Sequence, residues 1–110
     1  MPYGLTDKQT EEIKSIFASN NKVEKALLFG SRAKGNYKPG SDIDLAIIGN
    51  ELGLDDLLLF NNKLDDTYLP YTFDIVLYHQ INDPAVIEHI KRAGVIFYEK
   101  GERKMDLHQI

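Results

Sequence analysis

Apolar residues recur at two spacings along the chain, and these spacings predict an alternation of helices and strands. Ile13, Ile16 and Phe17 lie at helical spacing, so a helix is expected over 7–19. Thr6 and Gln9 precede and enter it with the spacing of a capping box. Similar stripes predict a helix over 54–67 and another that starts at Asn82-Asp83-Pro84, with Asp83 as N-cap and Pro84 at the first helical position, and ends at Gly94.

Four shorter apolar runs are typical of strands, at 23–29, 43–48, 72–78 and 95–98. Residues 45–48 are apolar throughout, as in a strand that is covered on both faces. The order of these elements predicts an α/β or α+β domain, with a mixed sheet of about four strands and helices packed on it.

The predicted helix over 54–67 is rich in leucine. Leu54, Leu57, Leu58 and Leu64 share one stripe, whereas Leu59 falls off it. An isolated surface leucine is ordinary in soluble proteins, and a patch that binds a partner is the alternative. Both interpretations stay open.

Composition places the chain among ordinary soluble domains. Its 110 residues suit one domain over 1–100 and a charged tail over 101–110, with 43% hydrophobic and 27% charged residues. A net charge of −4 without a basic block disfavours a protein that grips nucleic acid by its phosphates. The absence of cysteine excludes disulfides and thiolate metal sites. With no membrane-length apolar run and no signal-peptide pattern, a cytoplasmic location is expected.

The stretch after the first predicted strand carries the features of a phosphate site. Gly30 allows a sharp turn, Ser31 supplies a hydroxyl and Arg32 supplies a guanidinium. A helix that opens at Ala33 would add backbone amides that favour an anion. Lys34 is equally suited to contacting a phosphate and to remaining in solvent.

Two carboxylates follow about a dozen residues later. Asp42 and Asp44 stand at i and i+2, and therefore point to one side of the strand that they open. Neighbouring carboxylates repel unless a cation lies between them, and Mg²⁺ prefers such oxygen ligands together with substrate phosphates. The two halves of this stretch predict a site for a nucleoside triphosphate and its magnesium.

Asp74 interrupts the apolar run over 72–78. An unpaired carboxylate in a buried strand is costly, so Asp74 is either neutralised or paired with an arginine, or it joins Asp42 and Asp44 in a trio. The trio is the favoured interpretation. His79 lies close enough in sequence to be a candidate for the rim of that site, while His89 and His108 are interpreted as ordinary polar histidines.

The segments Gly-Ser-Arg-Ala-Lys-Gly at 30–35 and Ser-Asp-Ile-Asp-Leu at 41–45 resemble the signature of the DNA polymerase beta-like nucleotidyltransferases. Within that superfamily the chain is similar to the minimal nucleotidyltransferase (MNT or MntA-like) domains over nearly its whole length. The resemblance implies the nucleotidyltransferase fold, ATP as nucleotide donor, and Gly30, Ser31 and Arg32 at its phosphates. It also implies two Mg²⁺ ions on Asp42, Asp44 and Asp74, the last matching the family's third acidic residue.

The same resemblance implies a partner. Minimal nucleotidyltransferases are commonly the antitoxin of a HEPN-domain ribonuclease toxin and adenylylate a tyrosine of that toxin. Two alternatives remain open: nucleotidyl transfer to a small molecule such as an aminoglycoside, with the acceptor site built across a homodimer, and a module that neutralises its partner by binding alone. The acceptor, the preferred nucleotide and the oligomeric state are not specified by the sequence.

Overall fold

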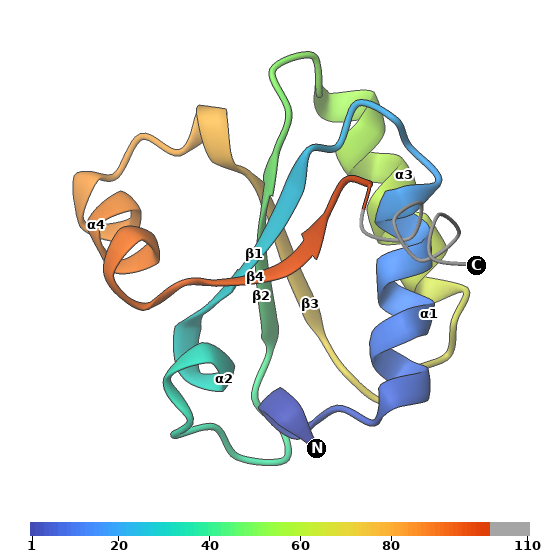
Figure 1. Ribbon diagram of the computed structural model, residues 1–110, viewed down its shortest axis with the longest axis vertical. Coiled ribbons are helices and arrows are strands. Elements are labelled where there is room, and N and C mark those ends of the chain that lie inside the picture. The colour runs from blue at the N-terminus through green and yellow to red at the C-terminus, as the bar shows by residue number, and fades with distance from the viewer. Residues whose placement is uncertain (102–110) are drawn as a thin grey trace.

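A four-stranded mixed sheet forms the centre of the computed structural model, which describes residues 1–101 (Figure 1). The spatial order is β3-β2-β1-β4, and β1 is antiparallel to both of its neighbours while β2 and β3 are parallel. The predicted mixed sheet is confirmed, and each predicted strand end lies within two residues of the observed one. The strands are β1 (Lys25–Phe29), β2 (Ile43–Ile48), β3 (Phe73–Leu77) and β4 (Val95–Glu99).

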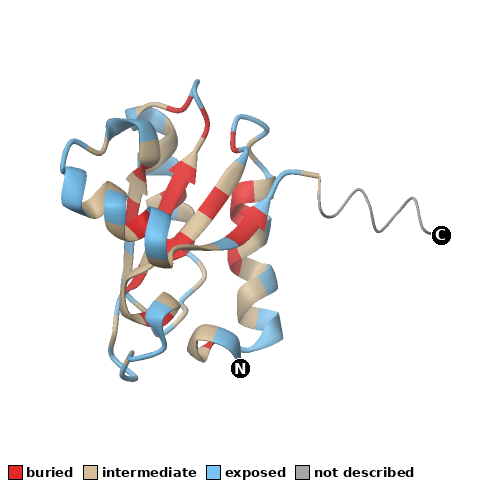
Figure 2. Cartoon of the chain, turned by 60° about the vertical axis from the view of Figure 1, so that its left-hand side comes forward, coloured by how far each residue is buried: buried red, intermediate tan, exposed pale blue. Residues whose placement is uncertain are grey.

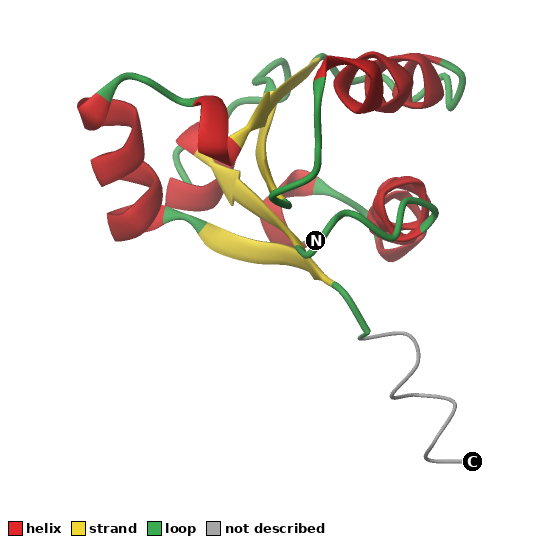
Figure 3. Cartoon of the chain, turned by 90° about the horizontal axis from the view of Figure 1, so that it is seen from above, coloured by secondary structure: helices red, strands yellow, loops and turns green. Residues whose placement is uncertain are grey.

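Helices cover both faces of the sheet, as Figure 3 shows from above. α1 and α3 pack on one face, and α2 and α4 lie on the other (Figure 1). Their bounds are α1 (Asp7–Ala18), α2 (Gly30–Lys34), α3 (Leu54–Asp65) and α4 (Pro84–Ala93), and two short 3₁₀ turns are η1 (Pro2–Gly4) and η2 (Tyr78–Gln80).

The predicted helix starts of α1 and α4 are confirmed at atomic detail. Thr6 Oγ1 accepts the Gln9 amide at 3.1 Å and the Thr6 amide donates to Gln9 Oε1 at 3.0 Å, which completes the capping box. Asp83 accepts the Ala85 amide at 2.9 Å, ahead of a proline at the first helical position.

The hydrophobic core lies between the sheet and the α1–α3 layer, where buried strand residues alternate with more exposed ones (Figure 2). Phe17 of α1 and Phe60 of α3 meet edge to face, with ring centroids 5.2 Å apart. Because side chains alternate across a sheet, the intervening positions of the strands, including Asp44 and Asp74, face the α2–α4 side. Both faces of β2 are covered, since Leu45, Ala46 and Ile47 are all buried, as predicted.

Two local predictions are wrong. The helix expected to open at Ala33 begins at Gly30 and ends at Lys34, where Gly35 caps it in the left-handed conformation. In α3 only half of the predicted stripe faces inward: Leu64 is buried and Leu57 packs against the core, whereas Leu54 and Leu58 are 65% and 53% exposed. The inner face also includes Phe60, which meets Phe17 of α1.

The predicted tail over 101–110 lies outside the described residues apart from Gly101. Within residues 1–101, every helix is too short or too polar to cross a membrane.

Candidate active site

The parallel pairing of β2 and β3 brings two carboxylates side by side. Asp44 of β2 stands opposite Asp74 of β3, and Phe29, the last residue of β1, stands opposite Asp44 on its other side. Asp42 lies two residues before Asp44, where the chain enters β2. Sequence-distant acids thus converge at one end of the sheet.

The negative charges of the other two acids act on Asp44. Burial, and then the negative charges of Asp74 and Asp42, raise the pKa of Asp44 from 3.8 to about 6. Within residues 1–101, however, no three acidic or histidine side chains already surround one point as the ligands of a metal ion do. A hydrogen bond between the side chains of Asp44 and Asp74 raises the pKa of Asp44 as well, so the two carboxyl groups lie close together. Their hard oxygen donors fit a divalent cation such as Mg²⁺.

Asp74 is exposed, which corrects the expectation of a buried strand around it. β3 is an edge strand, so only its inward residues, such as Ile75 and Leu77, are buried. The carboxylate of Asp74 therefore needs no arginine partner, and it is open to a ligand from solvent.

Gly30 joins the turn after β1 to the carboxylates. Its φ of +74° is one that side-chain-bearing residues rarely adopt, and a Cβ atom at this position would fall on the carboxylate of Asp44. Glycine thus lets the backbone turn directly against Asp44. Ser31 follows in the first turn of α2 and is partly exposed, as is required of a group that contacts a ligand.

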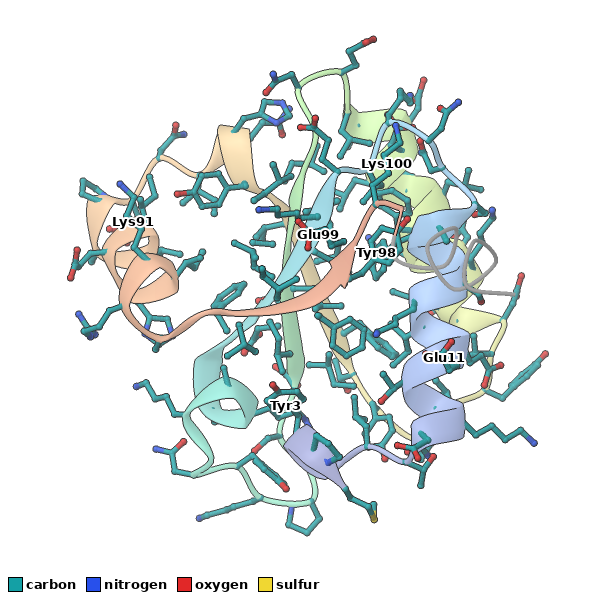
Figure 4. All side chains as sticks on the ribbon, viewed as in Figure 1. Tyr3, Glu11, Lys91, Tyr98, Glu99 and Lys100 are labelled. Carbon is teal, nitrogen blue, oxygen red and sulfur yellow. The ribbon has the colours of Figure 1, made fainter. Side chains whose placement is uncertain are left out.

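Arg32 is placed differently from the prediction that it contacts phosphate. Its side chain is only 2% exposed, and its guanidinium points into the protein. It donates to the carbonyl oxygens of Ser41 and of Tyr3, which Figure 4 labels in the N-terminal turn. These contacts do not support a direct role at the phosphates. Lys34, by contrast, is exposed.

His89 is the residue at this site that the sequence analysis missed. Its Nε2 accepts the Gly30 amide at 3.1 Å, and its ring meets that of Phe29 edge to face, with centroids 6.1 Å apart. The signal was available, because position 89 lies three residues after Val86 and four before Ala93, on the inward stripe of α4. A polar residue on an apolar stripe indicates a specific partner.

A cleft of about 570 Å³ opens beside Asp74. Apolar side chains dominate its walls, and they come from β1, β3, α3, α4 and the loop after η2. Gln80 lines this cleft, whereas His79, the candidate for the rim of the carboxylate site, is not among the described residues that line it. The apolar lining includes Phe29, Leu57, Val76, Ile81 and Val86, and Asp74 also lines the cleft. An apolar hollow with a few polar groups is the usual form of a small-molecule site.

Comparison with protein families gives one matching model, described as polymerase beta, nucleotidyltransferase, over residues 11–103. Comparison with curated proteins gives no match.

Solved structures share the fold. A chain of a toxin–antitoxin structure with AMP-PNP aligns with a TM-score of 0.69 and 21% identity, over 89% of this chain and 78% of that one. A variant of the toxin–antitoxin MntA–HpeT aligns with a TM-score of 0.68 and 20% identity, over 94% and 80%. A tri-AMPylated Shewanella oneidensis HEPN toxin in complex with an MNT antitoxin gives 0.63 and 16%, over 91% and 83%. At these identities the likeness establishes the fold alone.

Proposed function

The chain belongs to the polymerase beta nucleotidyltransferase family, and from this premise we propose that it transfers AMP from ATP to an acceptor hydroxyl. The observation that carries the proposal is the pairing of Asp44 with Asp74 across two parallel strands, with Asp42 two residues ahead. Three carboxylates in this arrangement suit a Mg²⁺–nucleotide complex much better than a structural role, because without a cation they repel one another.

In the proposed reaction the acceptor oxygen forms a bond to the α-phosphorus of ATP, the bond from that phosphorus to the β-phosphate bridge breaks, and pyrophosphate leaves. The proton of the acceptor hydroxyl passes to the carboxylate of Asp74, which is exposed beside the cleft. Mg²⁺, when bound by Asp42, Asp44 and Asp74 as one or two ions, neutralises charge on the phosphates and on both reacting oxygens.

The other residues hold the donor in place. The turn at Gly30 lies against Asp44, and Ser31 follows it in α2; the turn and the Ser31 hydroxyl would receive the β- and γ-phosphates. The apolar wall of the cleft near Phe29 would pack against the nucleoside. Arg32 is not assigned to the phosphates in this proposal, because its guanidinium is buried.

We further propose that the acceptor is a tyrosine of a HEPN-domain toxin and that the chain acts in the cytoplasm as its antitoxin. Support comes from the shared fold with toxin–antitoxin structures, one of which contains a tri-AMPylated HEPN toxin.

The test is a transfer assay with α-labelled ATP and Mg²⁺, in which the purified chain is incubated with and without a HEPN protein encoded beside it. Label is expected on the HEPN protein, and it should be lost in Asp42→Asn and Asp74→Asn while the complex still forms. Asp65→Asn, a change of an exposed carboxylate on α3, is the matched control and should label normally.

The outcomes separate the open alternatives. An inhibited HEPN protein without label would overturn the transfer reaction and leave neutralisation by binding. Label on an aminoglycoside or another small hydroxyl compound, with none on the HEPN protein, would replace the protein acceptor by a small-molecule one.

A further inference from the structure

Arg32 occupies a position that is unusual for a cation in a small domain. It is the one charged residue that is buried within residues 1–101, and its side chain is 2% exposed. Burial of a guanidinium is costly unless its donors are satisfied. Nε and Nη2 donate to the Ser41 carbonyl at 3.2 and 2.9 Å, and Nη1 donates to the Tyr3 carbonyl at 2.8 Å.

Two aromatic rings complete this environment. The central carbon of the guanidinium lies 5.2 Å from the ring centroid of Tyr37 and 5.0 Å from that of Tyr71. Contacts of a cation with tyrosine faces are favourable, and more so when they are shielded from water. Arg32 therefore joins the N-terminal turn, the loop over 35–42 and the segment before β3, which are remote in sequence.

Of the two carbonyl groups that Arg32 binds, that of Ser41 matters more for the site. Ser41 directly precedes Asp42, so its carbonyl belongs to the peptide group that leads into Asp42. Ser41 also makes two hydrogen bonds to Lys38 within the loop. The Ser41 hydroxyl accepts from the Lys38 amide at 2.8 Å, and the Ser41 amide donates to the Lys38 carbonyl at 2.9 Å. The two hydrogen bonds from Arg32 to this carbonyl fix the orientation of the peptide group, and thereby the direction in which Asp42 points.

We infer that Arg32 is a positioning residue: it holds the peptide between Ser41 and Asp42 so that the Asp42 carboxylate meets the divalent cation of the nucleotide. The inference rests on the proposed function for the identity of that cation. It assigns Arg32 to the metal side of the site, through the backbone, and removes it from the phosphates.

Two variants and one control test the inference. Arg32→Met removes the donors, and Tyr37→Leu removes one ring from the guanidinium without altering any cation. Lys34→Met removes an exposed charge two residues from Arg32 and is the matched control. Binding of Mn²⁺ is measured by electron paramagnetic resonance, and binding of ATP is measured separately without metal, at temperatures well below unfolding.

Arg32→Met and Tyr37→Leu are expected to weaken Mn²⁺ binding by roughly tenfold, as is usual when support for a metal ligand is lost. Metal-free ATP binding should stay within about twofold, and Lys34→Met should bind Mn²⁺ like the parent. If Arg32→Met lost metal-free ATP affinity while Tyr37→Leu did not, Arg32 would be a phosphate ligand and the inference would be overturned.

The backbone amide signals of Asp42 and Ile43 in ¹H–¹⁵N spectra provide a readout that needs no metal. They should shift, and exchange faster with solvent, in Arg32→Met but not in Lys34→Met. Unchanged signals would overturn the inference even if activity fell. If they change while the parent chain binds no Mn²⁺, the positioning role stands and the proposed function fails.

Discussion

The raised pKa of Asp44 makes the stability of the protein depend on pH. Its pKa of about 6 exceeds the ordinary value of 3.8, so the folded protein favours the protonated form more than the unfolded chain does. This contribution to stability is fully present below pH 3.8 and is lost as the pH rises through about 6. At neutral pH and without divalent cations, ionised Asp44 therefore opposes folding.

Asp44→Asn should accordingly raise the free energy of unfolding at pH 7.5 in a metal chelator, by roughly 1–2 kcal/mol after allowance for solvent screening. Near pH 4 the advantage should largely vanish, because parent Asp44 is then protonated when folded. Urea denaturation at both pH values measures it, with Asp65→Asn as control. An equal gain at both pH values would contradict the electrostatic explanation.

His89 offers a second prediction at the same scale. His89→Phe keeps an aromatic ring against Phe29 but removes the acceptor of the Gly30 amide, and so should cost about 1 kcal/mol. Hydrogen exchange at Gly30 should quicken several-fold, because the amide loses its partner. His89→Gln retains an acceptor oxygen and serves as the matched variant. Unaltered exchange at Gly30 in His89→Phe would show that this hydrogen bond does not form in solution.

The short helix α2 begins at one glycine and is capped at its end by another, and the two glycines differ in their surroundings. Gly30 and Gly35 both have positive φ, of 74° and 88°, but only at Gly30 would an added Cβ meet other atoms, those of Asp44. The Cβ at Gly35 would enter open space.

Gly35→Ala should therefore cost only the backbone strain, about 1–2 kcal/mol. Gly30→Ala should cost more and should also displace Asp44, so that Mg²⁺ no longer protects the protein from thermal unfolding. Thermal melts of both variants with and without Mg²⁺ check the difference. Equal melting temperatures, with Mg²⁺ protection intact in both, would remove the steric account of Gly30.

Short-range signals in the sequence predicted most elements of this fold. The capping box at Thr6 and Gln9, the Asp83-Pro84 start of α4 and the apolar run of β2 each act within a few residues, and each is confirmed. The convergence of Asp42, Asp44 and Asp74 followed from the period of strands and the family resemblance; their roles stay predictions.

Partners that meet only in the folded chain could not be inferred in this way. The inward turn of Arg32 depends on Tyr3, Tyr37 and Tyr71, which come from three separate segments. The face of α3 was also ambiguous, because its leucines surround much of the helix. Contact of Phe60 with Phe17 of α1 decides which face is inside, and helical spacing alone carries no information about that contact.

That outcome leaves an apolar surface on the outside of the molecule. Leu54, Leu58 and Leu59, which we term the α3 leucine face, are 65%, 53% and 45% exposed. Clusters of exposed apolar side chains commonly mark interaction sites. Leu57, from the same helix, lines the cleft together with Asp74, so the α3 leucine face continues toward the candidate active site.

A partner that presents a hydroxyl to this cleft can therefore rest on the α3 leucine face. Leu58→Glu should weaken the complex with the proposed HEPN partner by at least tenfold, while the free energy of unfolding changes by no more than about 0.5 kcal/mol, as is usual for an exposed site. Ile96→Glu, on the edge strand opposite β3, replaces an equally exposed apolar side chain, 55% exposed, and should bind normally. Calorimetric titration of both variants separates the possibilities: equal weakening would indicate a general effect of added charge, and unimpaired binding by Leu58→Glu would move the partner's contact to another face.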